Sequence, residues 1–368
     1  MGAAPPFRAE HIGSLLRPPG LLELRRKAGG GEAAPDALVH AQDQAIADAV
    51  KLQERVGLKL ATDGEFRRRS YHSYFYGQLG DITPDAVGDD TTGAVDGRAP
   101  QPAALVKTKL KWTRPIHVDD FTFLRARTGL TPKITIPGPC ALHFRGGDAA
   151  VTAHAYDDTD EFWRDTVEAF RRELAALAAA GCTYVQIDET AFAKFGDPEV
   201  QAALAARGDD WQRLIDHYID VTNQVLRAAP AGLRIGMHLC RGNRGGRWHA
   251  QGSYDAVAEK LFNRLEIGFY LLEYDSPRAG TFAPLRFVPG HKSVVLGLVS
   301  TKMAELEDKD ELKRRVEAAS RYVDLARLAV SPQCGFASVD AGNPIAPDIQ
   351  EAKLRLVVKL AQDIWGSS

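Results

Sequence analysis

The sequence predicts an α/β protein folded as a (β/α)₈ TIM barrel, and three observations point to this class. Short apolar runs alternate with longer amphipathic segments along nearly the whole chain, which is typical of βα units and a parallel sheet. Eight of these runs have the length and the bounding residues of strands. No Gly-x-Gly-x-x-Gly motif opens a helix, which disfavours a doubly wound dinucleotide-binding sheet. We therefore expect residues 1–368 to form a single barrel.

The expected strands share an apolar core that ends at Gly, Pro or a polar residue. In chain order they are EHIGS (10–14), LKLATDGEF (58–66), PKITIPGP (132–139), CTYVQIDET (182–190), RIGMHLC (234–240), FYLLEYD (269–275), SVVLGLVS (293–300) and RLAVSPQCGF (327–336). Helical periodicity with stop signals predicts helices between them. These cover a short segment after the turn at 17–19, then 35–57, 158–181, 209–229, 253–265, 305–325 and 347–365.

Residues 78–130 interrupt this alternation after the second strand. They are rich in Gly, Asp, Pro and Thr and contain only short β-like pieces. Long excursions of this kind are usually functional, so we expect an insertion that covers a site as a lid. A solvent-exposed decoration without a role fits the composition equally well.

The composition is that of a globular chain, with 45% hydrophobic and 26% charged residues. The net charge of −2 gives no electrostatic reason to expect nucleic acid or a membrane surface as a partner. There is no apolar run of about 18 residues and no signal-peptide core. The four widely spaced cysteines do not form a disulfide framework, which fits a reducing cytoplasm.

Four potential metal ligands stand at the ends of expected strands. His238 and Cys240 are two apart on one strand and so point to the same face. Glu273 and Cys334 end two further strands. Zinc favours such nitrogen, sulfur and carboxylate ligands. The simpler alternative is coincidence, because free cysteines are among the most buried residues.

Other polar residues end strands at the same face of the expected barrel, where barrel active sites lie. Ser14, Glu65 and Asp188 are the members of this group. The two acids could bind a substrate ammonium group. Alternatively, Asp188 caps a helix and Glu65 pairs with one of the arginines at 67–69. Arginines also follow the fifth strand, where a solvated loop is preferred over contact with an anionic donor or partner; they are Arg241, Arg244 and Arg247.

These residues lie in motifs that resemble the cobalamin-independent methionine synthase family, in its short form with only the C-terminal catalytic barrel. The matching stretches cover nearly the whole chain. They are HIGS (11–14), DGEF (63–66), QIDE (186–189), HLC (238–240), LEYDSPR (272–278) and SPQCGF (331–336).

The resemblance implies a zinc-dependent methyltransferase that forms methionine by attack of a zinc-bound homocysteine thiolate on an activated methyl group. It assigns His238, Cys240, Glu273 and Cys334 as ligands of Zn²⁺. It also assigns homocysteine-binding residues, with the backbone at Ile12 and Ser14 holding the carboxylate and Glu65 and Asp188 holding the amino group.

The methyl donor is less defined by the resemblance. The family's long form has a further N-terminal barrel that helps to bind polyglutamylated folate, and this chain lacks it. Lys302 stands where the long form has a proton-donating histidine, and only His143 and Phe144 could stack where it has a tryptophan. The donor is therefore expected to be methyltetrahydrofolate or a methylated corrinoid, which another protein could carry. The sequence is also compatible with a homo-oligomer.

Two other functions compete with this one. The first is zinc-dependent alkyl transfer to another thiol, as in the related epoxide–coenzyme M transferases. Glu65 and Asp188 favour an amino-acid thiol over coenzyme M, which has a sulfonate and no ammonium group. The second is a structural zinc barrel, which the neighbouring acids disfavour because a closed zinc site needs no substrate groups.

Overall fold

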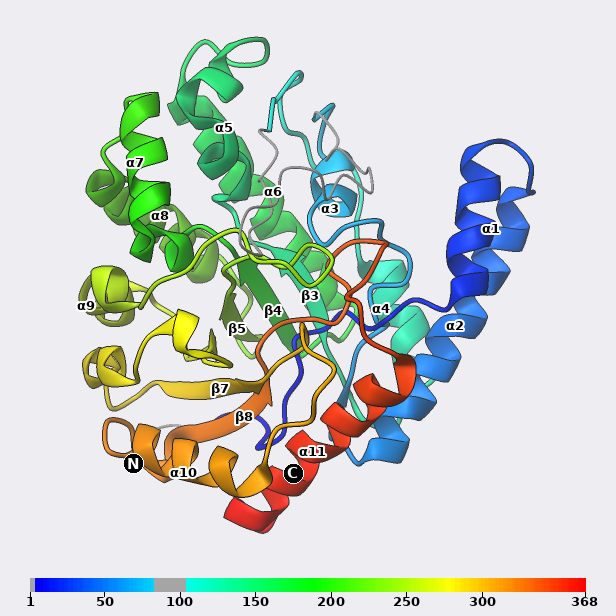
Figure 1. Ribbon diagram of the computed structural model, residues 1–368. Coiled ribbons are helices and arrows are strands. Elements are labelled where there is room, and N and C mark those ends of the chain that lie inside the picture. Colours follow the sequence, from blue (N-terminus) through cyan, green and yellow to red (C-terminus); the bar gives the residue numbers. More distant parts are fainter. Residues whose placement is uncertain (1–3, 83–103) are drawn as a thin grey trace.

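The central element of the computed structural model, which describes residues 4–82 and 104–368, is a parallel sheet of six strands in sequential order (Figure 1). The strands are β3 (Ile134–Pro137), β4 (Tyr184–Glu189), β5 (Arg234–Leu239), β6 (Phe269–Glu273), β7 (Ser293–Val299) and β8 (Leu328–Pro332). Their residues are almost all buried, as expected for a parallel sheet covered by helices. A second parallel pair joins β1 (Leu60–Ala61) to β2 (Thr131–Pro132).

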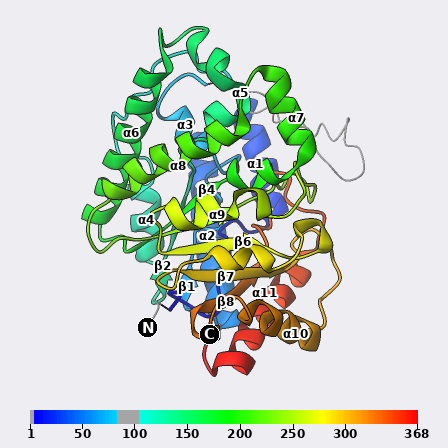
Figure 2. The ribbon, with the colours of Figure 1, turned by 90° about the vertical axis from the view of Figure 1, so that its left-hand side faces the viewer.

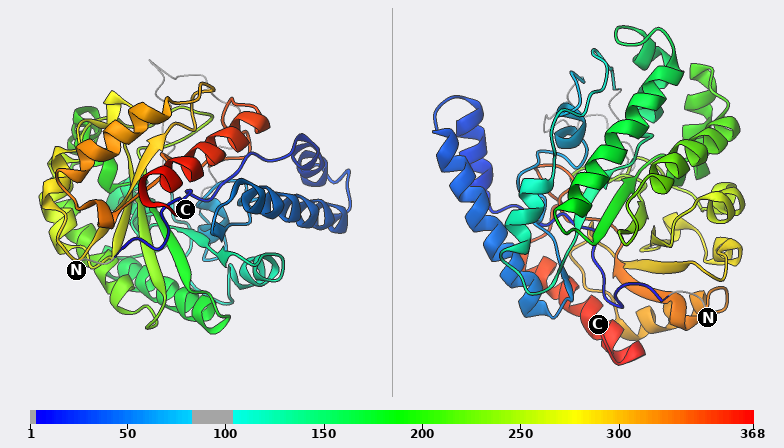
Figure 3. Two further views of the ribbon diagram at one scale, coloured as in Figure 1. Left: turned by 90° about the horizontal axis from the view of Figure 1, so that it is seen from below. Right: turned by 180° about the vertical axis from the view of Figure 1, so that it is seen from behind.

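Helices surround these strands, as the view from below shows (Figure 3). The α-helices are α1 (Pro19–Gly29), α2 (Pro35–Val56), α3 (Ser73–Gly77), α4 (Val118–Arg125), α5 (Ala141–Thr152), α6 (Thr159–Ala179), α7 (Pro198–Arg207), α8 (Trp211–Arg227), α9 (Asp255–Arg264), α10 (Lys309–Ser320) and α11 (Pro347–Trp365). The short 3₁₀ helices are η1 (Phe192–Gly196), η2 (Pro277–Ala279), η3 (Ala283–Phe287) and η4 (Leu325–Arg327). Neighbouring helices pack in pairs, with α6 beside α8 and α10 beside α11 (Figure 2).

Local sequence explains where several helices begin and end. The Asp158 carboxylate accepts a hydrogen bond from the Glu161 amide and so caps α6. A proline in the first turn begins α2 and α11, where its missing amide proton is not needed. Left-handed glycines end the same two helices, at Gly57 and Gly366.

The N-terminal segment lies between β8 and the loop after β1. The Glu10 amide donates to the Val330 carbonyl over 2.9 Å, and the Leu15 amide donates to the Gly64 carbonyl over 3.1 Å. Beyond one bridge between Ala9 and Val330, the segment forms no strand of its own. Gly13, with φ of 131°, bends the chain out of the extended conformation there.

These findings confirm an α/β fold with parallel sheets. The closed (β/α)₈ barrel is not confirmed, because the strands of the described residues form a six-stranded sheet and a separate pair. Residues 10–14, the predicted first strand, form no strand, and the bridge at Ala9 lies just before them. The structure adds the helices α5 and α7, which the sequence reading left out.

The predicted insertion at 78–130 is partly outside the described residues, which leave out 83–103. Its last part contains α4, which packs against α2 and α6 as a helix of the outer layer. The lid therefore stays a prediction for the remainder. Among residues 4–82 and 104–368, no helix has the length and apolar content needed to cross a membrane.

A fully buried ion pair lies inside the strand layer, below the carboxyl ends of the strands. The Lys133 ammonium is 3.0 Å from a Glu10 carboxylate oxygen and 2.9 Å from Oε1 of Gln186, and it also contacts the His11 carbonyl. The other Glu10 oxygen accepts from the Tyr184 hydroxyl over 2.5 Å. This set links the N-terminal segment to β3 and β4.

Candidate metal centre and substrate pocket

The four predicted metal ligands come together at the carboxyl ends of β5, β6 and β8. The donor atoms of His238, Cys240, Glu273 and Cys334 all lie within 4.8 Å of one another, and all four side chains are buried. The two sulfur atoms are 3.6 Å apart, and the Cys240 sulfur is 3.8 Å from a Glu273 oxygen. The parallel register produces this convergence, because strand ends of one sheet meet at one edge.

The orientation of His238 suits a metal ligand. Its Nδ1 atom lies 3.2 Å from the Leu271 carbonyl, so Nδ1 carries the proton that is donated to this oxygen. Nε2 is then a lone-pair acceptor, and it is buried without a hydrogen-bond partner among the described residues. This imidazole nitrogen, the two sulfurs and the one carboxylate form a donor set that zinc favours.

The two thiols have coupled protonation. The hydrogen bond to Cys334, together with burial, raises the pKa of Cys240. The same hydrogen bond, together with the nearby charge of Lys302, lowers the pKa of Cys334 well below its usual value. Cys334 is therefore the more acidic thiol of the pair.

Arg241 holds Glu273 in place, which the sequence reading did not anticipate. Its side chain is fully buried, and Nη1 lies 3.6 Å from a Glu273 carboxylate oxygen. The Arg241 amide also donates to that carboxylate over 3.0 Å, and the guanidinium lies 4.0 Å from the centre of the Tyr254 ring. The preference for a solvated loop was wrong for Arg241, because contacts with distant segments enclose it.

A pocket opens above this cluster. The predicted homocysteine-binding residues all line it, together with three of the four potential metal ligands. They are Ile12, Ser14, Glu65 and Asp188. The structure thus brings the two predicted groups into one cavity.

The two acids of the pocket have raised pKa values. Burial raises the pKa of Asp188 to about 7, and His238 opposes this shift. Burial also raises the pKa of Glu65, opposed chiefly by Arg68, whose Nη1 atom is 4.0 Å from Oε1. Oε1 of Glu65 accepts from the Thr135 hydroxyl over 2.8 Å, while Oε2 is buried without a partner among the described residues. An unpartnered buried oxygen of this kind suits a cationic ligand.

The alternatives for these acids can now be compared with the geometry. Asp188 lies within β4 and accepts from Gln186 over 2.6 Å, so it does not cap a helix. Glu65 has the expected arginine neighbour in Arg68, but at the long distance of 4.0 Å. Glu65 also has φ of 62°, a strained conformation for a residue with a side chain. Such strain concentrates at functional sites.

Gly13 gives a testable measure of how closely this pocket is packed. A Cβ atom there would lie 2.6 Å from Cγ2 of Thr135 and 2.9 Å from Oε1 of Glu65, and its φ of 131° disfavours any side chain. We expect Gly13→Ala to lower the free energy of unfolding by about 1–3 kcal/mol in urea denaturation. Gly29→Ala, where no atom lies within 4 Å of the added Cβ, is the control. Equal midpoints for the two variants would contradict the close packing.

Lys302, the predicted proton donor, follows β7 and lies beside the metal cluster. Its side chain is 9% exposed, and Nζ is buried without a hydrogen-bond partner among the described residues. Lys302 is not one of the described residues that line the pocket. Its charge adds to the hydrogen bond from Cys240 in lowering the pKa of Cys334.

The two proposed stacking residues do not face the pocket. His143 and Phe144 belong to α5 and are buried against other aromatic residues. His143 contacts the Tyr218 hydroxyl at 2.7 Å instead. The pocket is lined by further residues that the sequence reading missed: Tyr71, His72, Arg145, Lys194, Asn243 and His249. No motif in the sequence marks them.

Comparisons with known proteins identify the family of the chain. Residues 7–362 match the family model described as "Cobalamin-independent synthase, Catalytic domain". The uncharacterized protein YxjH of Bacillus subtilis (strain 168) is 38% identical over 364 residues, which cover 98% of this chain and 95% of that protein.

Two solved structures are similar over nearly their full lengths. One is a putative vitamin-B12 independent methionine synthase from Listeria monocytogenes, with a TM-score of 0.75 and 31% identity over 100% of both chains. The other is a B12-independent methionine synthase from Shewanella sp. W3-18-1 in complex with selenomethionine, with a TM-score of 0.74, 19% identity and 97% coverage of both chains; at that identity it supports the fold alone. The chain therefore belongs to the cobalamin-independent methionine synthase family, a family of methyltransferases.

Proposed function

We propose that this protein transfers a methyl group to the thiol of homocysteine and so forms methionine, in a zinc-dependent reaction. The observation that carries this proposal is the convergence of His238, Cys240, Glu273 and Cys334 within 4.8 Å. They adjoin a pocket that also offers the unpartnered Oε2 of Glu65. The name of the Listeria protein, a putative vitamin-B12 independent methionine synthase, supports the same reaction.

Three of the four members of the metal cluster have a distinct supporting contact. Leu271 fixes the ring of His238, Arg241 fixes the carboxylate of Glu273, and the Gly242 amide donates to the Cys240 sulfur over 3.2 Å. Such contacts hold ligands in the orientation that binding requires. A bound zinc ion would lower the pKa of the substrate thiol, so that the thiol reacts as a thiolate at neutral pH.

The pocket residues orient the amino-acid part of homocysteine in this proposal. The carboxylates of Glu65 and Asp188 hold its ammonium group through charge-assisted hydrogen bonds. The backbone at Ile12 and Ser14 holds its carboxylate. Ser14 is itself fixed, since its hydroxyl oxygen accepts from the Ala337 amide over 3.2 Å.

The methyl donor is a methylfolate or a methylated corrinoid. With a methylfolate, Lys302 gives a proton to the departing folate. We further propose that the N-terminal segment closes the strands into a single catalytic barrel. The hydrogen bonds of this segment to β8 and to the loop after β1 support that arrangement. We also propose that the insertion at residues 78–130 covers the site as a lid, and that the protein is cytoplasmic.

Alkyl transfer to coenzyme M is the main alternative, and the pocket argues against it. Coenzyme M would place a sulfonate near the buried carboxylates of Glu65 and Asp188. Like charges in a buried site are costly, and neither carboxylate could then hydrogen-bond to its ligand while ionised.

The direct test is methionine formation by the purified, zinc-loaded protein. Homocysteine is supplied with mono- or polyglutamylated methyltetrahydrofolate and, separately, with methylcobalamin; coenzyme M replaces homocysteine in a parallel assay. Formation of methionine with any of these donors supports the proposal. The donor that gives the fastest reaction then defines the role of Lys302. Alkylation of coenzyme M without methionine would overturn it.

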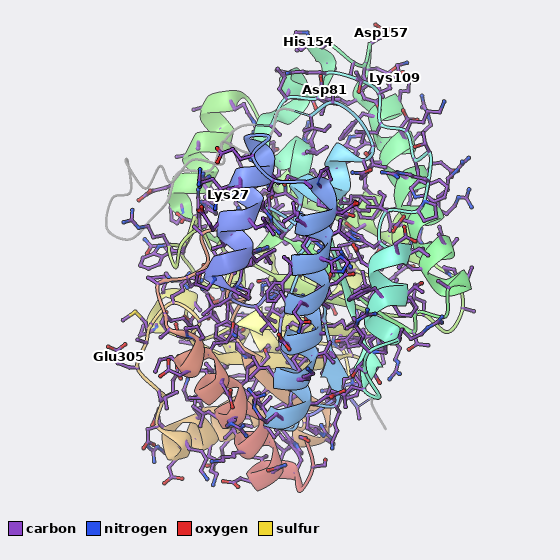
Figure 4. All side chains as sticks on the ribbon, turned by 90° about the vertical axis from the view of Figure 1, so that its right-hand side faces the viewer. Lys27, Asp81, Lys109, His154, Asp157 and Glu305 are labelled. Carbon is purple, nitrogen blue, oxygen red and sulfur yellow. The ribbon has the colours of Figure 1, made fainter. Side chains whose placement is uncertain are left out.

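Glu65→Gln tests the amino-acid subsite separately from the metal. A charge-assisted hydrogen bond contributes about 1.5–3 kcal/mol, so we expect homocysteine to bind about 10–150-fold more weakly, by calorimetry on the zinc-loaded protein. Zinc content should stay at the wild-type level. Glu305→Gln is the control, since Glu305 lies at the outer surface (Figure 4). Unchanged homocysteine affinity in Glu65→Gln would remove Glu65 from the substrate site.

A further inference from the structure

Two buried residues behind the pocket are connected to the Glu65 carboxylate by hydrogen bonds. Nη1 of Arg68 donates to Oγ1 of Thr135 over 2.9 Å, and this hydroxyl donates to Oε1 of Glu65 over 2.8 Å. A guanidinium group has only donors, so it cannot accept the hydroxyl proton. The single proton of the Thr135 hydroxyl is therefore directed to Glu65.

Packing fixes the direction of the Thr135 side chain. Thr135 lies in β3 and is 2% exposed. A Cβ atom on Gly13 would lie 2.6 Å from Cγ2 of Thr135 but 3.6 Å from its Oγ1, so the backbone at Gly13 packs against the methyl group. Rotation of a β-branched side chain exchanges its methyl and hydroxyl groups, and few rotamers are open to it. The methyl group thus keeps the hydroxyl pointed at Glu65.

Arg68 is a fully buried cation among carboxylates. Its backbone is held by Arg17, whose Nη2 atom donates to the Glu65 and Arg68 carbonyls over 3.1 Å and 2.9 Å. Burial disfavours the charge of Arg68, but its pKa is nevertheless raised, because negative charges surround it. The carboxylates responsible are those of Glu65, Asp63, Asp120 and Asp188. Two of them are the acids of the pocket.

The distance between Arg68 and Glu65 leaves room for a ligand. A guanidinium in direct contact with a carboxylate commonly binds both of its oxygens. Here Nη1 of Arg68 stays 4.0 Å from Oε1 of Glu65, and the Thr135 hydroxyl bridges the two. Oε2 of Glu65 is left without a partner among the described residues. Burial raises the pKa of Glu65, and the Arg68 charge and the Thr135 hydrogen bond are the main influences that oppose it.

We propose that Thr135 and Arg68 are positioning residues that make the pocket select thiols with an ammonium group over thiols without one. The inference rests on the proposed function, in which Glu65 binds the amino group of homocysteine. Arg68 supplies the charge that favours the ionised carboxylate. Thr135 occupies Oε1, which leaves Oε2 to accept from the ammonium group. Neither residue is among the described residues that line the pocket.

Calorimetry on the zinc-loaded protein tests this selection with two ligands: homocysteine and 4-mercaptobutyrate, which is homocysteine without its amino group. The readout is the ratio of the two affinities. Thr135→Val keeps the shape of the side chain and removes the hydroxyl, so we expect the preference for homocysteine to fall by about tenfold while 4-mercaptobutyrate binds as before. Thr135→Ser restores the hydroxyl and should restore most of the preference.

Arg68 is tested by the same ratio. Arg68→Met removes the charge and should lower the preference for homocysteine, whereas Arg68→Lys keeps the charge and should retain part of it. Thr166→Val is the matched control for Thr135→Val, because Thr166 is also fully buried and its hydroxyl has no partner among the described residues. Both ligands should bind this control as they bind the wild type.

Two results would overturn the positioning role. Thr135→Val keeps the wild-type preference for homocysteine, or it weakens both ligands equally, as a general loss of packing would. The Arg68 variants give a second comparison that does not depend on the packing of β3. A wild-type protein that binds 4-mercaptobutyrate as tightly as homocysteine has a different meaning, because the proposed homocysteine site itself then fails.

Discussion

Replacing Cys334 with serine is expected to abolish zinc binding and methionine formation together. Cys334 supplies one of two sulfurs in the cluster and is the more acidic of the two thiols. A serine hydroxyl cannot ionise under the same conditions and is a poor ligand for zinc. Mutation of a residue that only supports a metal ligand typically lowers metal affinity by about 10–100-fold. Loss of a ligand itself should therefore lower the affinity by more than that.

Metal analysis after dialysis against a chelator measures this effect. Wild-type protein should retain zinc, and Cys334→Ser should release it. Cys182→Ser is the matched control, because Cys182 is also buried but does not belong to the metal cluster; its thiol donates to the Tyr184 carbonyl over 3.4 Å. Near-ultraviolet circular dichroism shows whether each variant is folded. A folded Cys334→Ser protein that binds zinc with wild-type affinity would contradict the ligand assignment.

Replacing Lys133 with methionine is expected to cause the largest loss of stability. The Lys133–Glu10 pair is 0% exposed on both sides, and removing the ammonium leaves the Glu10 carboxylate charged in the interior. Breaking a buried pair in this way typically costs about 3–5 kcal/mol. The backbone carbonyl of His11 and the side-chain oxygen of Gln186 would lose their donor as well.

Urea denaturation measures this loss against two references. Lys309→Met breaks a pair with Asp363 whose lysine is 39% exposed, and should cost only about 0–1 kcal/mol. The double variant Lys133→Met with Glu10→Gln should recover part of the loss, because no buried charge is then left without a partner. If Lys133→Met is as stable as Lys309→Met, the buried pair is not a main source of stability.

The metal cluster was predictable from the sequence for a physical reason. His238, Cys240, Glu273 and Cys334 each end an apolar run, and parallel strands place such ends at one edge of a sheet. Because each of these residues ends a recognisable strand, the sequence was enough to predict that they lie close together in the fold.

The basic part of the pocket could not be predicted in the same way. Arg145 belongs to α5, where Gly146 and Gly147 break the helical periodicity, and Gly147 has φ of 67°. Lys194 lies in a 3₁₀ helix without a sequence signature. Arg241 reads as a surface loop residue, and only its tertiary contacts with Glu273 and Tyr254 bury it.

The pairing of the N-terminal segment with β8 sets the order in which the protein can be completed during synthesis. Ser14 accepts from the amide of Ala337, and Glu10 pairs with Val330, across more than 300 residues. Ribosomes add about 5–20 residues per second, so the first segment waits on the order of 15–60 s for its partners. Contacts of such long range also slow folding itself. The substrate pocket therefore forms among the last parts of the molecule, and a nascent chain that stops before β8 has no such pocket.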